Sequence, residues 1–368
     1  MATIFSILLL LDLVLISKSD QLGDLLDSLI TGASDDKINN IINYLRNLLN
    51  GILDLTYQEL YNLVDVLNLL NSMGIKVTEE KLKSTAQNVV LINGLTNGIW
   101  TAKLGYFSLL PDEYQKRLSG VTDIEMETVT GIQTIRNKRQ TSNLKNATTQ
   151  QNLITLRTAN TIFSSYELLS CTSEYTSNSS KNKSNYDCRG GSPYKAWELI
   201  KSNGICTGSD YLGEGGCKPY PFGPKNSFPI LKDCYNKCTN KTWGVPYDAD
   251  RKNYVSSTST LKGEQAIIDE LNKNGPVVAI YNVYKDFYFY ASGEDGVYFH
   301  TSGDYDKPHA VVIVGYGTAY CDNERTPYWI IRNSWGTSQN LTGFLKFKRG
   351  NNECGIDANL SFGIPKIN

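Results

Sequence analysis

The eight cysteines of this 368-residue chain all lie between Cys171 and Cys354, and none occurs in the first 170 positions. Eight cysteines gathered in one part of a chain favour disulfides formed in an oxidising compartment. Residues 20 to about 90 contain no cysteine, no cluster of metal-ligating residues and no glycine-rich phosphate loop. The sequence predicts neither a metal nor a cofactor.

The first 19 residues have the pattern of a secretory signal peptide. Ile4 to Ile16 is a mostly apolar run that only Asp12 interrupts, and the following Ser17-Lys18-Ser19 resembles a small-residue cleavage site. A buried N-terminal helix is the alternative interpretation. No other apolar run is long enough to span a membrane, so the sequence predicts no membrane span.

Asn-x-Ser/Thr sequons agree with passage through the secretory pathway. From them we expect glycosylation at Asn178, Asn182 and Asn240 and a secreted, extracellular or lysosomal location. Further sequons occur at Asn146, Asn340 and Asn359. The formal net charge of −1 provides no field that would attract nucleic acid or an anionic membrane, so neither is expected as a partner. The oligomeric state is not predicted.

Residues 20 to about 90 show the period of amphipathic helices. Thr56 and Glu59 form a potential capping box, Gly74 is a stop signal and Thr78 can open a further helix. The apolar positions of the first two helices are Ile38, Ile41, Ile42, Leu45, Leu48, Leu49, Ile52, Leu60, Leu63, Val64, Leu67 and Leu70. This segment is interpreted as a pro-segment or partner surface, or as a plain helical hairpin that packs on the main domain.

From residue 247 onward the sequence changes to short β-rich runs bounded by Gly, Pro and Asn. These runs are 277–280, 310–314, 328–332 and 344–348. The folded part is therefore expected to combine a helical half with a sheet-rich half, which is an α+β class. A cleft between two such halves is the default place for a functional site.

A series of short motifs follows one another along the chain. They are Trp100-Thr101-Ala102 and the run from Tyr114 to Gly120 within 92–120, then Ser164-x-x-Glu167-Leu168-Leu169-x-Cys171, Cys188-Arg189-Gly190-Gly191 with Ala196-Trp197, 204–208 with 216–220, 274–277, Asp286-Phe287, 296–298, 307–317, 328–336 and 353–356. In this order the motifs resemble those of the papain family of cysteine peptidases and, within it, cathepsin B, whose pro-peptide is similar to 92–120.

The resemblance implies a papain-like, two-lobed α+β fold, with a helical left lobe and a β-barrel-like right lobe. It also implies three segments along the chain. These are a signal peptide at 1–19, a helical pro-region at 20–128 and a peptidase domain at 129–368.

By the same resemblance, His309 is the catalytic base, Asn333 orients it and Trp335 covers the pair. In the ungapped register of this resemblance, Leu144 stands at the position of the catalytic cysteine and Lys138 at that of the glutamine that binds the oxyanion. A shifted register that keeps Gln140 as that glutamine puts Asn146 at the nucleophile position, and neither register supplies a thiol. A leucine cannot form an acyl-enzyme. His300, the only other histidine, belongs to no motif.

Disulfide pairings also follow from the resemblance, which implies Cys171–Cys234 and Cys217–Cys238. The family partner of Cys188 would stand near Thr141 and is absent. Cys206 has no family counterpart and is a candidate to pair with Cys188. Cys321 and Cys354 either pair with each other or stay free.

Three hypotheses remain open on function. The first is a secreted pseudoprotease that binds a peptide or protein ligand in its inter-lobe cleft. The second is a peptidase with an unorthodox nucleophile, either the hydroxyl of Ser142 or that of Thr148. The third is that segment 121–160 is a mis-joined or decayed stretch of a gene whose product normally carries the cysteine.

Overall fold

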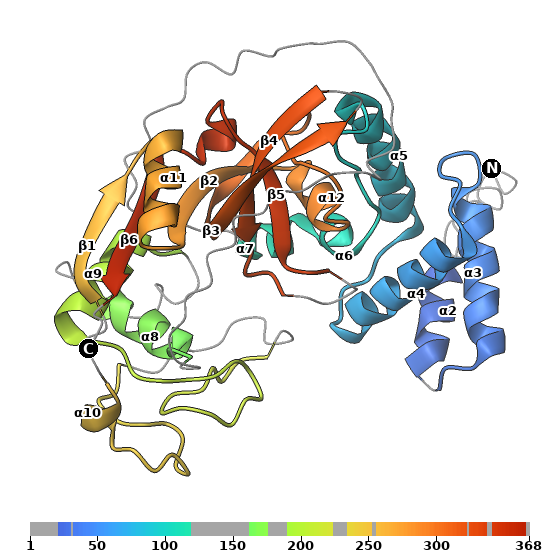
Figure 1. Cartoon of the computed structure of the whole chain (residues 1–368). Coiled ribbons are helices and arrows are strands. Elements are labelled where there is room, and N and C mark those ends of the chain that lie inside the picture. The colour runs from blue at the N-terminus through green and yellow to red at the C-terminus, as the bar shows by residue number, and fades with distance from the viewer. Residues whose placement is uncertain are drawn as a thin grey trace, which may run out of the picture.

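The computed structural model shows a helical N-terminal region, a six-stranded antiparallel sheet and a cysteine-rich lobe (Figure 1). The structure describes residues 21–30, 32–118, 162–175, 190–223, 234–251, 255–321, 324–336 and 341–365. This combination of helices with an antiparallel sheet confirms the α+β class. Within the described residues, no helix combines the length and the apolar content that crossing a bilayer requires.

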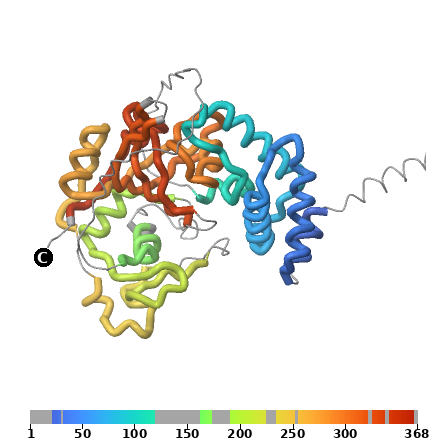
Figure 2. Tube along the Cα trace, turned by 45° about the vertical axis from the view of Figure 1, so that its right-hand side comes forward, coloured from blue at the N-terminus to red at the C-terminus, as the bar shows by residue number. Residues whose placement is uncertain are grey.

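The N-terminal region is helical as the sequence predicts. Its helices are α2 (Gln21–Ile30), α3 (Asp35–Leu49), α4 (Tyr57–Ser72), α5 (Glu79–Thr96), α6 (Tyr106–Leu109) and α7 (Asp112–Leu118). The capping box between Thr56 and Glu59 is present, and the Thr78 hydroxyl accepts a hydrogen bond from the Lys81 amide. Gly74 follows α4 with a φ of 78°, a left-handed conformation that glycine adopts without strain. Helices α2 to α4 lie at the far end of the molecule from the cysteine-rich lobe (Figure 2).

The sheet has the strand order β1-β6-β2-β3-β4-β5. Its strands are β1 (Val255–Leu261), β2 (Val277–Tyr284), β3 (Tyr305–Cys321), β4 (Glu324–Arg332), β5 (Phe344–Lys348) and β6 (Asn359–Pro365). Burial alternates along β2, whose odd-numbered residues are buried, as expected of side chains that point to opposite faces. Helix α11 (Glu264–Lys273) packs on β2 and β3, α12 (Phe287–Ala291) packs on β2, and the short η2 (Glu353–Gly355) precedes β6.

The cysteine-rich lobe comprises the described parts of 162–251. It contains α8 (Ser165–Tyr175), α9 (Pro193–Asn203) and α10 (Tyr247–Asp250), and α9 joins it to the sheet by packing on β1 and β6. Both implied disulfides, Cys171–Cys234 and Cys217–Cys238, are present.

The expectation that Cys206 pairs with Cys188 is wrong in this structure, because Cys206 carries a free thiol. Its side chain is completely shielded and turns into a small core with Cys217 and Tyr247. Cys188 lies outside the described residues, as does the side chain of Cys321. Cys354 is also a free thiol, which is one of the two outcomes that the sequence left open.

One hydrophobic core connects the N-terminal helices to the sheet. It extends without a break from Leu22 of α2 to Leu360 of β6. The junction is made where the chain at 99–101 runs beside 295–297: Val297 N donates to Ile99 O at 3.0 Å and Thr101 N to Asp295 O at 3.2 Å. Gly296 permits this approach, because a Cβ atom there would lie 2.2 Å from Ile99 O. This pairing buries Trp100, which is 1% exposed, between the N-terminal helices and the sheet.

Candidate active site

The sheet brings His309 and Asn333 together from two adjacent strands. His309 lies on β3 opposite Tyr281 of β2, and Asn333 directly follows β4, which pairs with β3. Their side chains meet with His309 Nε2 at 2.9 Å from Asn333 Oδ1. The two residues that the resemblance singles out are therefore in direct contact, although 24 positions separate them in the chain.

The hydrogen bonds around Asn333 define the tautomer of His309. The Ser334 backbone N–H donates to the same Asn333 oxygen at 2.9 Å, and a backbone amide can only donate, so the contacting atom is the carbonyl oxygen. That oxygen can only accept, which makes His309 Nε2 the protonated nitrogen. Nδ1 is then left with the lone pair that a general base needs.

The His309 ring is enclosed by aromatic side chains. It is 5% exposed, and its centroid lies 5.8 Å from that of Tyr281 and 5.2 Å from that of Trp335. This burial lowers the pKa of His309 to about 4, and the hydrogen bond to Asn333 only partly offsets the effect, because a charged imidazole loses more hydration than a neutral one. The imidazole is therefore neutral at pH 7. The contact with Trp335 places that indole beside the pair, as the resemblance implies.

The N-terminal region reaches this site. Trp335 Nε1 donates to the carbonyl oxygen of Leu118, the last residue of α7, at 2.9 Å. The indole also stacks on Tyr288 of α12, with a centroid distance of 5.5 Å and an interplanar angle of 12°, and contacts Phe107 of α6 at 5.1 Å. The side chain that packs on the candidate base is thus held partly by residues that precede position 119.

A second set of contacts holds α7 in place. The Tyr288 hydroxyl lies 3.0 Å from Gln115 O and 2.7 Å from Asp306 Oδ2. Lys285 Nζ donates to Gln115 Oε1 at 3.2 Å and forms an ion pair with Asp112 at 3.4 Å. These polar contacts join α7 to α12, to Lys285 just before it and to the start of β3.

The positions that correspond to the nucleophile and the oxyanion donor, Leu144 and Lys138, lie outside the described residues, as do Ser142 and Thr148. The two free thiols among the described residues, Cys206 and Cys354, contact side chains other than His309. The Cys206 amide donates to Glu167 Oε2 at 2.5 Å, and Cys354 Sγ lies 3.5 Å from Glu353 Oε1. Neither thiol forms a hydrogen bond to His309 within the described part of the chain.

The second histidine has a structural environment that the sequence did not predict. His300 Nδ1 lies 3.1 Å from Asp286 Oδ1, and its ring stacks on Tyr284 with a centroid distance of 3.9 Å. Asp286 also accepts from the Tyr298 hydroxyl and the Thr301 amide. The buried carboxylate thus organises the turn that follows residue 298. Asp286 belongs to a family motif, but nothing in the sequence connected it to His300.

Of the expected glycosylation sites, Asn178 and Asn182 lie outside the described residues and Asn240 is described. Asn240 Nδ2, the atom that would carry a glycan, donates to Glu214 O at 2.9 Å and to Gly216 O at 3.1 Å. Its Oδ1 accepts from the Thr242 amide and hydroxyl at 3.0 and 2.7 Å. In the folded chain, both amide hydrogens of Asn240 therefore serve to connect two loops.

Comparison with known proteins supports the same fold. A family model described as papain family cysteine protease matches residues 141–364. Cathepsin B-like cysteine proteinase 4 of Caenorhabditis elegans is 38% identical over 223 residues, which cover 56% of this chain and 61% of that protein. Cathepsin B-like cysteine proteinase 1 of Ostertagia ostertagi is 36% identical over 188 residues, with coverages of 48% and 52%.

A solved structure extends the similarity to the fold. Procathepsin B S9 from Trypanosoma congolense is similar with a TM-score of 0.55 and 27% identity, over 76% of this chain and 98% of that chain. This likeness confirms the papain-like α+β fold. The curated relatives are matched over about three fifths of their length or less.

Proposed function

This chain belongs to the papain family of cysteine proteases, and from that premise we propose that it is a catalytically inactive, cathepsin B-like member that enters the secretory pathway. In this proposal it binds a peptide or protein segment in the cleft between its lobes and does not cleave it. Residues 1–19 act as the signal peptide, 20–128 as the pro-region and 129–368 as the peptidase-like domain.

The observation that carries the proposal is that His309 is placed as a catalytic base but the family's cysteine position holds no thiol for it to activate. The contact between His309 and Asn333 supports the assignment of base and orienter, but the 170 residues before Cys171 contain no cysteine. Resemblance puts Leu144 at the nucleophile position and Lys138 at the oxyanion position. An alkyl side chain cannot attack a carbonyl carbon, and one missing oxyanion donor alone costs roughly 10²- to 10³-fold in rate.

The protonation state of His309 agrees with this proposal. An activated cysteine is a thiolate whose pKa is lowered by a neighbouring protonated histidine. Burial instead holds the pKa of His309 at about 4, so the ring lacks the positive charge that such a pair requires at neutral pH.

The proposal is tested with the full chain and a fluorogenic peptide amide. We expect no hydrolysis and no labelling by a thiol-directed epoxide probe, whereas a labelled peptide binds and is recovered intact by mass spectrometry. Hydrolysis that disappears in His309→Ala would overturn the proposal. Leu144→Cys is the matched gain-of-function variant, and its labelling by the probe would support the assignment of this position.

The second candidate is a peptidase that uses Ser142, and the contact between His309 and Asn333 is the observation in its favour. If any measured hydrolysis is unchanged in Ser142→Ala, this candidate is discarded. Peptides that cover residues 121–161, identified by mass spectrometry from the native source, would test the remaining hypothesis that this segment is not part of the natural product.

A further inference from the structure

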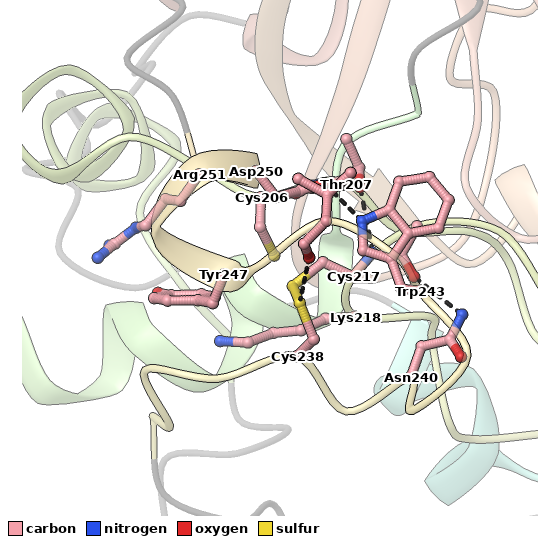
Figure 3. The surroundings of a disulfide bond; sticks show 12 residues. Cys206, Thr207, Cys217, Lys218, Cys238, Asn240, Trp243, Tyr247, Asp250 and Arg251 are labelled. Carbon is pink, nitrogen blue, oxygen red and sulfur yellow. Dashed lines mark hydrogen bonds between the residues drawn. A yellow bond between two sulfur atoms is a disulfide. The ribbon is translucent and has the colours of Figure 1, made fainter.

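Three cysteines meet in the small core of the cysteine-rich lobe (Figure 3). Cys217 and Cys238 form a disulfide, while Cys206 is a free thiol with no exposed surface. The Sγ atoms of Cys206 and Cys217 and a carboxylate oxygen of Asp250 all lie within 4.8 Å of one another. A buried free thiol thus lies beside a disulfide that could exchange with it.

The backbone places Cys206 beside Cys217 independently of the disulfide. Lys218 N donates to Thr207 O at 3.0 Å, and Cys217 N donates to the Thr207 hydroxyl at 3.1 Å. The two segments approach closely because both carry a glycine at the contact. A Cβ atom on Gly216, whose φ is +81°, would lie 2.4 Å from the backbone nitrogen of Gly208. Any state that keeps this pairing keeps Cys206 near Cys217.

We propose that Cys206, Cys217 and Cys238 form a disulfide-exchange site, which makes Cys238 a modification site for small-molecule disulfides and alkylating agents. The Cys206 thiolate attacks Cys217 Sγ, so that the Cys206–Cys217 bond forms and the Cys217–Cys238 bond breaks. The electron pair leaves on Cys238 Sγ, which takes up the proton that Cys206 lost. One thiol and one disulfide exist before and after the step, so neither an oxidant nor a reductant is consumed.

Cys238 is the cysteine whose thiol can react with reagents in solution once the Cys217–Cys238 bond is broken. It packs against the small core from its edge and is only partly buried, with its Sγ 3.6 Å from Val245 O. Release removes the covalent attachment of Cys238 to Cys217. The Thr239 and Asn240 amides still donate to Cys217 O, and the Cys171–Cys234 bridge is retained, so the change is confined to the Cys238 side chain and its surroundings.

The burial of Cys206 and the charges around it slow its exchange with the Cys217–Cys238 bond. Burial, followed by the Glu167 carboxylate of α8, raises the pKa of Cys206 far above that of an ordinary thiol, with Asp250 of α10 adding to it and Lys218 opposing it. Tyr247 of α10 hydrogen-bonds Glu167, and Arg251 Nε lies 3.7 Å from the same carboxylate. Since only the thiolate attacks a disulfide, Cys206 keeps its proton and exchange is slow at neutral pH.

Chain connectivity favours the alternative bond before folding is complete. Cys206 and Cys217 are 11 residues apart (217 − 206), against 21 for Cys217 and Cys238. In an unstructured chain, the shorter loop closes more readily by a factor of roughly two to three. The Cys206–Cys217 bond is therefore expected to be accessible to this chain.

The test uses the full chain, incubated without reductant with iodoacetamide at pH 7 and pH 8. Trypsin alone leaves Cys206 and Cys217 in one peptide, because no Lys or Arg lies between them. A glutamate-specific protease cuts after Glu214, which does lie between them, so a double digest identifies the Cys206–Cys217 cross-link as two joined peptides. We expect a Cys206–Cys217 cross-link and alkylated Cys238 to accumulate in equal amounts. Their rate should rise about tenfold between the two pH values, because the thiolate fraction does.

Variants make the result specific. Cys206→Ala should abolish alkylation of Cys238 while the Cys171–Cys234 cross-link is still recovered as a check on folding. Cys354→Ala, which removes the other described free thiol, should leave the exchange unchanged. Alkylation of Cys206 with Cys217–Cys238 intact would refute the proposal. So would a Cys188–Cys206 cross-link, or no modification of either Cys206 or Cys238 after prolonged incubation at pH 8.

Discussion

The sheet, together with the N-terminal helices, and the cysteine-rich lobe are held together by different forces. The first region has one apolar core that extends from Leu22 to Leu360. Among its described residues, the second has a small cluster of Cys206, Cys217 and Tyr247 with two partly buried neighbours, and buried side chains such as Tyr166 and Leu199 lie outside that cluster. It relies instead on both observed disulfides and on a buried ion pair. The comparison shows that a segment with little apolar area to bury is stabilised by covalent bonds and by charge pairing.

The ion pair of the lobe is unusually well enclosed. Lys218 Nζ lies 3.1 Å from Glu167 Oε1, and the two side chains are 2% and 1% exposed. Tyr247 donates its hydroxyl to Glu167 at 2.6 Å, and Lys218 donates to Tyr235 O at 2.6 Å. Removing one partner of such a pair is costly because it leaves an uncompensated buried charge.

The largest effect is expected from a substitution in the hydrophobic core that the N-terminal helices share with the sheet. Trp100→Ala removes a ring that packs on Tyr290 and Tyr298 at 5.6 and 5.4 Å, together with the hydrogen bond from Nε1 to Phe299 O. We expect the free energy of unfolding to fall by about 5 kcal/mol. Hydrogen exchange should report loss of protection in α5 and in the sheet together. Loss confined to the helices would show that the core is not cooperative.

The second prediction concerns the lobe alone. Replacing Cys171 and Cys234 by alanine opens a 63-residue loop, which on the chain-entropy model costs about 4 kcal/mol. Hydrogen exchange should show increased opening of α8 and of the residues near Cys234, while the sheet stays protected. Equal destabilisation of the sheet would contradict the separation of the two regions.

The third prediction is a pH dependence that arises in the sheet region. The pKa of His309 is about 4 in the folded chain and about 6.5 when unfolded. The unfolded chain therefore binds more protons between these values, so this residue lowers stability as pH falls from 6.5 to 4. The loss should reach about 3 kcal/mol and then level off.

A matched variant is needed because another buried group has the opposite effect. Burial raises the pKa of Asp357 to about 6, so the folded chain takes up a proton there before the unfolded one, and stability rises as pH falls from 6 to about 4. The difference in unfolding free energy between the wild type and His309→Gln, measured by urea titration at each pH, isolates the histidine. A difference that stays constant from pH 7 to pH 4 would rule out the buried-neutral assignment.

The smallest expected effect concerns Asn240. A glycan on Nδ2 replaces one of the two hydrogens that are donated to Glu214 O and Gly216 O, so one hydrogen bond, worth about 1 kcal/mol, is lost. We expect the natively folded protein to be largely unmodified at this sequon, and Asn240→Asp to destabilise the lobe. Mass spectrometry of the proteolytic peptide that contains Asn240, before and after glycosidase treatment, checks the first point, and complete occupancy of Asn240 would refute it.

Local elements could be predicted from sequence because neighbouring residues determine them. The capping box at Thr56 and Glu59, the stop at Gly74 and the strands at 277–280 and 328–332 all occur where expected. Family resemblance correctly implied both observed disulfides. It did not imply the state of Cys206, because that side chain has no family counterpart and its direction depends on packing against Cys217 and Tyr247.

The sequence by itself determined the periodicity of the helices, the strand-forming runs and the absence of any cysteine before Cys171. The contact between His309 and Asn333, the neutral state of the imidazole and the meeting of three sulfurs were decided only by tertiary structure. Those features depend on which distant segments come within hydrogen-bonding or van der Waals range and on how much water they exclude. Periodicity along a chain carries no information on either quantity.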